Sequence, residues 1–354
     1  MASWDAMPCI GSSLDDIDLN LFITRYLPLA IPKEVLADDH RDVRDKMASL
    51  RLYDKKYDCP TNAAILLFGK QVQKWFPGAY IQHVQFEGKD NASEILNQYE
   101  FSGNLMNALP KLKTFVETAV VKKRPVPISV LQEKIRTNYP EWAIRELLMN
   151  AVMHRDYQSN TPSKFYIYDD RLEIVNPGGL YGNARPDNFP RVNDYRNPVI
   201  AEALRVMGYV NKFNRGIARV QKELLDNGNG IAQFNVDMIT VFSVGVTNAK
   251  GNNVSDNVSE EYWKYYDFES LNLSDKSLKI IELCSTVPMC KKDLMKAIGV
   301  TNQSNNVRAI VGPLLTEELI WPCAEDANRV RGVRYVLTAK GKAFLTYIQS
   351  MHLF

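Results

Sequence analysis

The chain of 354 residues carries a formal net charge of +2, with 45% hydrophobic and 24% charged residues. This length allows two or three domains with cores of their own, and the composition is ordinary for a globular protein. No stretch approaches the run of about 18 apolar residues that a membrane-spanning helix requires. The five cysteines form no CxxC pair, which argues against a disulfide framework or a structural zinc site. A net charge this small neither demands nor excludes a nucleic-acid partner.

The N-terminal region is predicted to become ordered only after its first residues. Residues 1–14 are predicted to be disordered, and they lack the basic region and the apolar core of a signal peptide, so a reducing cytoplasm is the expected compartment. A helix is predicted to begin at Leu14, with Ser13 or Asp15 as its cap. Helical periodicity continues over residues 33–52, where many charged residues predict a solvated face.

Two apolar segments and a basic one follow. Residues 62–70 form a short continuous apolar run, which predicts a buried strand, and residues 79–86 are predicted to be its partner strand. Residues 91–121 are predicted to form a connecting helical stretch that Pro110 kinks or breaks. The basic residues at 122–124 indicate a solvated linker, with a phosphate-binding patch as the alternative.

The central stretch of the chain begins as a predicted helix, for which Pro140 suits the first position. Its apolar residues recur at helical spacing, at Ile144, Leu147, Leu148, Ala151 and Val152. Glu146, Asn150 and His154 recur at every fourth position, so they share a polar face of the same helix. An ordinary exposed helix face would show the same spacing, and His154 could equally serve as a cation near the helix C-terminus.

A predicted hairpin follows this helix. Residues 165–168 alternate as a strand does, and a turn at 169–171 leads to a short apolar strand over 172–175. That strand runs into the sequence Asn176-Pro177-Gly178-Gly179. The central stretch is therefore a helix that presents a carboxylate and an amide, followed by a hairpin that ends in a glycine turn.

The segment beyond this turn is irregular and polar over residues 180–198. A loop of this length inside a compact domain is usually a lid or a binding loop. A helix is predicted over residues 199–207, and Asn214-Arg215-Gly216 leads into a further helix that ends at Asn227-Gly228. A loop with glycine that feeds a helix N-terminus is a natural anion site, because free N–H groups and the helix dipole point at the ligand.

The last 85 or so residues, beyond a strand predicted over 238–246 and a polar linker, are predicted to form a separate small domain. Three helices and a hairpin are expected there, with the helices over residues 277–284, 291–298 and 305–318 and the hairpin between Trp321 and residues 335–338. Three short helices and a basic hairpin make a winged helix, which is a variant of the helix-turn-helix.

Polar side chains in this small domain predict contacts with double-stranded DNA. The third helix begins with residue types that reach base edges, namely Gln303, Asn305, Asn306 and Arg308. The hairpin supplies arginines for phosphate contacts, namely Arg329, Arg331 and Arg334. The alternative is a winged helix used for protein contact or dimerisation.

The central motifs, in their order along the chain, resemble the GHKL (Bergerat-fold) ATP-binding domain. They are Glu146-Leu-Leu-x-Asn150-Ala, His154-Arg155-Asp156-Tyr157 and Asp170-Arg171-Leu-Glu-Ile-x-Asn176-Pro177-Gly178-Gly179. The resemblance covers roughly residues 60–345. It is strongest to bacterial transcriptional regulators, labelled RecG-related, that pair this domain with a Schlafen-type AlbA domain and a winged helix.

The resemblance implies ATP and Mg²⁺ as cofactors. It puts Glu146 where the family has a water-activating base and Asn150 where it has a magnesium ligand. The implied nucleotide contacts are Asn150, His154, Asn176, Gly178, Gly179, Arg215 and Gly216. Asn214 replaces a family glycine, and Asn176 replaces the aspartate that meets the adenine amino group. An Asn carbonyl can accept the same hydrogen bond, but the side chain can also turn its amide outward.

The sequence therefore predicts an α+β protein: an N-terminal α/β region (15–121), a GHKL-like α/β sandwich (122–247), a linker (248–267) and a C-terminal winged helix-turn-helix (268–354). The N-terminal region resembles the tail of an AlbA-associated domain. The predicted function is an ATP-binding transcriptional regulator in which nucleotide binding is coupled to DNA binding, with homodimerisation and weak Mg-dependent ATPase activity left open. The alternative is a degenerate GHKL-like scaffold that binds no nucleotide and acts as a DNA- or protein-binding module.

Overall fold

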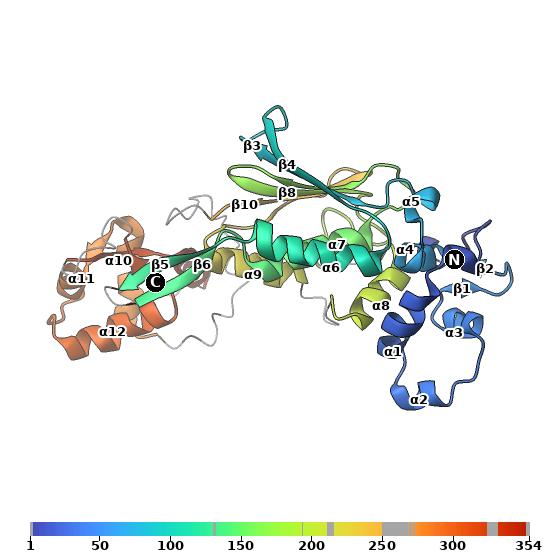
Figure 1. Ribbon diagram of the computed structural model, residues 1–354. Helices are drawn as coiled ribbons and strands as arrows, with labels where there is room; N and C mark the ends of the chain where they lie inside the picture. Colours follow the sequence, from blue (N-terminus) through green and yellow to red (C-terminus); the bar gives the residue numbers. More distant parts are fainter. Residues whose placement is uncertain are drawn as a thin grey trace. The chain divides into compact units, whose positions relative to one another are not determined.

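A computed structural model of the chain describes residues 3–129, 132–192, 194–210, 216–249, 268, 271, 273–323 and 332–351. Contacts between residues divide the chain into two compact units (Figure 1). The first, here the sheet unit, comprises residues 1–120, 144–217 and 233–246, and the second, here the C-terminal unit, comprises residues 121–143, 218–232 and 247–354. No helix in the described part of the chain is long and apolar enough to cross a membrane.

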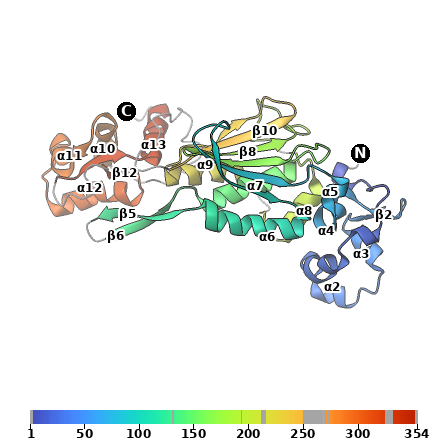
Figure 2. The same cartoon turned by 45° about the horizontal axis from the view of Figure 1, so that its top comes forward.

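The sheet unit is built on a six-stranded sheet with the strand order β4-β3-β7-β8-β10-β9. The strands are β3 (Ile81–Glu87), β4 (Glu94–Phe101), β7 (Ser163–Ile167), β8 (Arg171–Pro177), β9 (Gln233–Asn235) and β10 (Val241–Thr247). β7 runs parallel to β3, whereas the pairs β3–β4, β7–β8 and β9–β10 are antiparallel. The helices α6 (Leu105–Phe115) and α7 (Glu141–His154) lie along one face of this sheet (Figures 1 and 2).

The register of the central strands explains which side chains face these helices. His83, Phe165 and Ile174 are aligned across β3, β7 and β8, and all three are buried. The ring centroids of Phe115 in α6 and His83 lie 4.6 Å apart. Strand alternation sends Tyr166 to the other face. The helix, the hairpin and the strand alternation predicted for the central stretch are thus confirmed.

The segment predicted as a buried strand at residues 62–70 is a helix, α4 (Asn62–Phe68), so that prediction is wrong. Thr61 caps it by accepting a hydrogen bond from the N–H of Ala64. Every residue of α4 is buried, and a helix buried on all sides shows the same continuous apolar run as a buried strand. The strand β3 instead pairs with β4 and β7.

The helical stretch predicted over residues 91–121 is also partly wrong. Residues 94–101 form the edge strand β4, because β3 offers them a ladder that local sequence does not reveal. The helical part begins at Leu105 with α6 and continues as a π-helical turn, η4 (Val116–Val120). Pro110 lies inside α6 without ending it.

Residues 3–14 are ordered, contrary to the prediction. They form short 3₁₀ turns, η1 (Trp4–Ala6) and η2 (Leu14–Asp16). The fully buried Asp5 carboxylate accepts hydrogen bonds from the N–H groups of Val199 and Ile200, at 2.7 and 3.0 Å. These groups open the helix α8 (Pro198–Val206), so Asp5 satisfies two of its free donors from almost 200 residues away. A long-range cap of this kind leaves no local pattern in the sequence.

The rest of the N-terminal region consists of short elements. The helix predicted from Leu14 occurs in pieces, since η2 is capped by Ser13 and is followed by the π-helical η3 (Leu21–Tyr26) and by α1 (Leu27–Ala30). The remaining elements are α2 (Lys33–Ala37), α3 (Val43–Ser49), β1 (Tyr53–Asp54), β2 (Cys59–Pro60) and α5 (Val72–Trp75).

The C-terminal unit contains a hairpin, most of helix α9 (Gly216–Asn227), four further helices and a small sheet. The hairpin joins β5 (Lys123–Ser129) to β6 (Gln132–Thr137), so the basic residues predicted as a linker lie next to or within a strand. The further helices are α10 (Asp275–Thr286), α11 (Lys291–Ala297), α12 (Ser304–Thr316) and α13 (Ala339–Ser350). The sheet has the order β11-β13-β12, from Met289–Cys290, Arg334–Leu337 and Ile320–Pro322.

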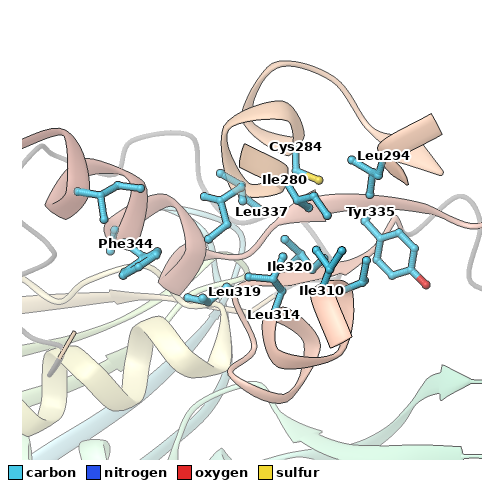
Figure 3. Close-up of a cluster of buried hydrophobic side chains, with 14 of the residues drawn as sticks. Ile280, Cys284, Leu294, Ile310, Leu314, Leu319, Ile320, Tyr335, Leu337 and Phe344 are labelled. Atoms are coloured by element: carbon cyan, nitrogen blue, oxygen red, sulfur yellow. The ribbon is translucent and has the colours of Figure 1, made fainter. Parts of the chain in front are cut away.

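A cluster of apolar side chains joins α9, the helices α10 to α13 and the small sheet (Figure 3). It includes Ile280 and Cys284 from α10, Leu294 from α11, Leu314 from α12, and Phe344 from α13. Burial raises the pKa of the Cys284 thiol to about 12, so this cysteine acts as a small apolar residue of the core. Helix α13 was not predicted. Of the predicted linker 248–267, only residues 248 and 249 are described.

Candidate functional site

A pocket opens in the sheet unit between α7, the ends of β8 and β10, and the loop over residues 180–197. It encloses about 760 Å³ of unfilled space, part of it open to solvent. Mostly apolar walls with a few polar groups are typical of small-molecule sites. The apolar lining includes Leu147 and Ala151 from α7, Ile174 from β8 and Val244 from β10.

Helix α7 contributes one face to this pocket. Leu147, Asn150, Ala151 and His154 line it, and their spacing of three and four residues puts them on one side of a helix. The predicted polar face thus delivers Asn150 and His154 to the same cavity. Glu146 is not among the lining residues, although it is buried with an exposed fraction of 7%.

Glu146 lies one turn away, beside the start of α9. A Cβ added at Gly216 would meet its carboxylate unless the Glu146 side chain moved, so the start of α9 lies directly beside that carboxylate. Burial raises the pKa of Tyr195, and the nearby charge of Glu146 raises it further. The carboxylate is therefore enclosed between a helix start and the 180–197 loop. Asn214 and Arg215 lie outside the described residues.

His154 is neutral at physiological pH. Burial, and then the nearby charge of Arg196, lower its pKa from 6.5 to about 4. Its ring stacks on Tyr195, with centroids 5.5 Å apart. The reading of His154 as a cation near the helix C-terminus is therefore wrong, because its pocket disfavours the charged form. It can offer a neutral imidazole to a ligand.

The two glycines after β8 are explained by close packing. Gly178 has a φ of +94°, which favours glycine, and its N–H donates to the carbonyl of Thr240 at 2.7 Å. The N–H of Gly179 donates to the carbonyl of Ile239 at 2.9 Å, and an added Cβ would lie 2.5 Å from the carbonyl oxygens of Met238 and Ile239. Both glycines line the pocket, but their N–H groups are already used within the sheet.

Asn176 takes part in a buried chain of hydrogen bonds that the sequence did not suggest. The β7–β8 register pairs Lys164 with Val175, which puts Ser163 opposite Asn176, and the Ser163 hydroxyl donates to Asn176 Oδ1 at 2.7 Å. Arg155, which follows α7, donates from Nη1 to that hydroxyl at 3.0 Å. All three side chains are buried. The hairpin turn held a signal for this pairing that the sequence analysis missed, since counting back from the turn puts residue 163 opposite residue 176.

The loop over residues 180–197 is tied down at its base and packed over the pocket. Asn197 donates from Nδ2 to the carbonyls of Met153 and Arg155, at 2.9 and 2.8 Å. Phe189 packs edge-on against Phe234 and Phe242, with centroids 5.3 and 5.9 Å away. The loop thus covers the pocket with apolar side chains.

Within the loop, Asp194 accepts hydrogen bonds from the backbone N–H and the side-chain Nδ2 of Asn183, at 2.7 and 2.9 Å. Arg196 donates to the carbonyls of His154 and Gly179, at 3.1 and 3.2 Å. The predicted polar loop therefore has a fixed path along the part that the structure describes.

The residues predicted to meet DNA lie at the start of α12 and in β13. Gln303, Asn305 and Arg308 are exposed. Asn306 is half-buried, because its Nδ2 donates to the Thr301 hydroxyl at 2.9 Å and thereby helps to fix the turn before α12. Arg334 opens β13, and Arg329 and Arg331 lie outside the described residues.

One family model agrees with the ATPase-like character of the central domain, and one solved structure shares the fold. A family model described as "Putative ATP-dependent DNA helicase recG C-terminal" matches residues 161–244. The crystal structure of the DIP2311 protein from Corynebacterium diphtheriae is similar over 98% of this chain, with 18% identity and a TM-score of 0.54. At this identity the likeness concerns the fold alone, and this chain spans 66% of the length of that protein's chain. No curated protein matches the sequence. The chain therefore contains an ATPase-like domain.

Proposed function

We propose that this chain is a nucleotide-binding transcriptional regulator: the pocket of the sheet unit takes a purine nucleoside triphosphate, and the C-terminal unit binds double-stranded DNA. The observation that carries the proposal is the convergence of Asn150, His154 and Asn176 on one largely apolar pocket. The match of the surrounding segment to an ATPase-like family supports it. ATP is the nucleotide that this family and the GHKL resemblance suggest.

The pocket residues suit the parts of such a ligand. The apolar walls of the pocket suit a purine ring, and Asn176 can hydrogen-bond the edge of the base. Asn150 offers a carboxamide oxygen, which is a suitable ligand for Mg²⁺, and Mg²⁺ usually completes its shell with phosphate oxygens and water. Bound Mg²⁺ would neutralise charge on the phosphates. No group of three or more His, Cys, Asp and Glu side chains forms a metal site within the described ranges.

Glu146 is the proposed base if the nucleotide is hydrolysed. Its carboxylate lies one helical turn from Asn150 on α7, and it could accept a proton from a water molecule that attacks the terminal phosphate. The start of α9 now packs against that carboxylate. Turnover therefore requires this helix start to move, and hydrolysis should be slow.

Calorimetric titration of the full chain with nucleotide and Mg²⁺ tests the binding proposal. Wild type should bind saturably, and Asn150→Ala should lose most of the affinity. Glu146→Gln keeps the shape of the side chain and removes the base, so it should retain binding while phosphate release falls to background. Normal hydrolysis by Glu146→Gln would rule out the base assignment.

A second candidate is the scaffold that binds no nucleotide, which one observation favours. The N–H groups of Gly178 and Gly179 are used within the sheet and so are not free to hold a phosphate. An absence of binding heat at millimolar nucleotide, for wild type and Asn150→Ala alike, would select this candidate.

The proposed DNA-binding part is a winged helix made of α10, α11, α12 and the sheet β11-β13-β12. The exposed start of α12 supports it, because Gln303, Asn305 and Arg308 present the side chains that read base edges and phosphates. Fluorescence anisotropy of labelled duplex DNA, over a range of salt concentrations, would measure the affinity for DNA. Arg308→Ala should weaken binding, whereas Lys279→Ala on α10 is a matched control that removes one positive charge elsewhere. We also propose that the chain forms a homodimer, and analytical ultracentrifugation would test this by measuring its mass in solution.

A further inference from the structure

The polarity of the pocket wall at Asn176 is set by a buried arginine. The Arg155 side chain donates from Nη2 to the carbonyls of Gly78 and Thr161, at 2.5 and 2.7 Å, and from Nη1 to Ser163 Oγ at 3.0 Å. Arg155 has an exposed fraction of 2%. A guanidinium only donates hydrogen bonds, so Ser163 Oγ must be the acceptor in this contact.

The Ser163 hydroxyl is therefore left with one proton to donate. Its neighbour at 2.7 Å is the side-chain oxygen of Asn176, and no other described residue accepts from this hydroxyl. If the Asn176 amide were turned over, Nδ2 would face Ser163 and the buried hydroxyl proton would lose its acceptor. Such a loss costs the desolvation free energy of a buried hydroxyl group. The chain from Arg155 through Ser163 thus holds Oδ1 of Asn176 toward Ser163.

The other end of the Asn176 amide faces the pocket. Asn176 is 98% buried, with an exposed fraction of 2%, and it lines the cavity beside Leu147, Ile174 and Val244. Its Nδ2 donates to no residue in the part of the chain that the structure describes. A hydrogen-bond donor without a partner, in an otherwise apolar wall, calls for an acceptor on the ligand.

We infer that this pocket selects a 6-oxopurine nucleotide, such as a guanine or hypoxanthine nucleotide, over an adenine nucleotide. The inference rests on the proposed nucleotide function and identifies the base. The O6 of a 6-oxopurine accepts from Asn176 Nδ2. The 6-amino group of adenine would bring a donor against that donor, whereas a carboxylate at residue 176 would accept from it. The lost hydrogen bond corresponds to a preference of roughly ten- to a hundredfold.

A series of bases tests this on the unmodified protein. Calorimetric titrations with Mg²⁺ use GTP, ITP, purine riboside triphosphate, which carries only hydrogen at position 6, and ATP. Affinity should fall in that order, with GTP and ITP equal within a few-fold and ATP at least about tenfold weaker than GTP. Equal affinity for GTP and ATP, or a preference for ATP, would overturn the inference.

Two variants then test the cause. Asn176→Asp replaces the donor with an acceptor and should reverse the order, so that ATP binds more tightly than GTP. Ser163→Ala releases the Asn176 amide and should reduce the GTP-to-ATP ratio toward one. Ser159→Ala is the matched control, because Ser159 meets Arg155 through its backbone carbonyl, and it should keep the wild-type ratio. Circular dichroism and thermal unfolding verify that each variant is folded.

The outcomes separate this inference from the proposed function. Tight ATP binding that depends on Asn150, with no preference for GTP, leaves the nucleotide function standing and refutes the role of Asn176. A failure of all four nucleotides to bind refutes both. Unchanged base preference in Ser163→Ala and Asn176→Asp also overturns the inference.

Discussion

Acidification should destabilise the sheet unit, because two of its histidines are held neutral in the folded state. His83 is fully buried, with Nδ1 2.9 Å from the carbonyl of Phe165 and no described partner for Nε2. Burial lowers the pKa of His83 from 6.5 to about 4. The pKa of His154 is lowered to about 4 as well, by burial and by Arg196.

The sign and size follow from proton linkage. In the unfolded chain both side chains have a pKa near 6.5, so between pH 6.5 and pH 4 the unfolded state binds protons that the folded state does not. The stability that each histidine contributes is present above pH 6.5 and is lost as the pH falls toward 4. Each is worth about 1.4 kcal/mol per pH unit, or about 3 kcal/mol over the whole interval. Together they give a slope that is about 1.4 kcal/mol per pH unit at pH 6.5 and approaches about 2.7 kcal/mol per pH unit below pH 5.5, which is large against a total stability of about 5–15 kcal/mol.

Urea unfolding between pH 7.0 and 5.5 measures this pH dependence, for which linkage gives a total loss of about 2.5 kcal/mol, in a range where few exposed carboxylates titrate. His83→Gln and His154→Gln should each remove about half of the slope, and the double variant should remove nearly all of it. The exposed His40 is the matched control, and His40→Gln should leave the slope unchanged. A full wild-type slope in the double variant, or ring resonances of both residues that titrate near pH 6.5, would refute the reasoning.

Three further predictions concern single residues. Asp5→Ala leaves two buried N–H groups at the start of α8 without acceptors, so it should lower the free energy of unfolding by about 2–4 kcal/mol; a change below about 0.5 kcal/mol in urea would contradict the capping role. Gly179→Ala puts a Cβ 2.5 Å from two carbonyl oxygens and should lower the melting temperature by several degrees, unlike Gly245→Ala, where an added Cβ meets no atom within 4 Å. Arg308→Ala should reduce the slope of the logarithm of the DNA-binding constant against the logarithm of salt concentration by about one. An unchanged slope would mean that DNA does not contact Arg308.

The core of the candidate site could be predicted from local sequence. The four-residue spacing of α7 puts Asn150 and His154 on one face, and the turn at residues 169–171 sets the hairpin that carries Asn176 and the two glycines. Helical periodicity and strand alternation are local properties, so they survive in the folded protein wherever packing agrees with them. The same holds for α10, α11 and α12, each of which begins within a few residues of its predicted start.

Predictions failed where a distant segment decided the conformation. Residues 62–70 are apolar on every side, and only their packing makes them the helix α4. Residues 94–101 become a strand because β3 offers an open edge. Asp5 is ordered because the start of α8 needs acceptors. In each case the stabilising contact lies far away in the sequence, and no local period records it.

The sequence by itself determined which residue types could meet in the pocket, since backbone periodicity delivers side chains to one face. Their chemical state was decided only by the tertiary structure. Burial beside Arg196 makes His154 neutral, and the hydrogen bonds from Arg155 through Ser163 turn the Asn176 amide toward the cavity. Charge and hydrogen-bond direction depend on desolvation and on neighbours, and these exist only once the chain has folded.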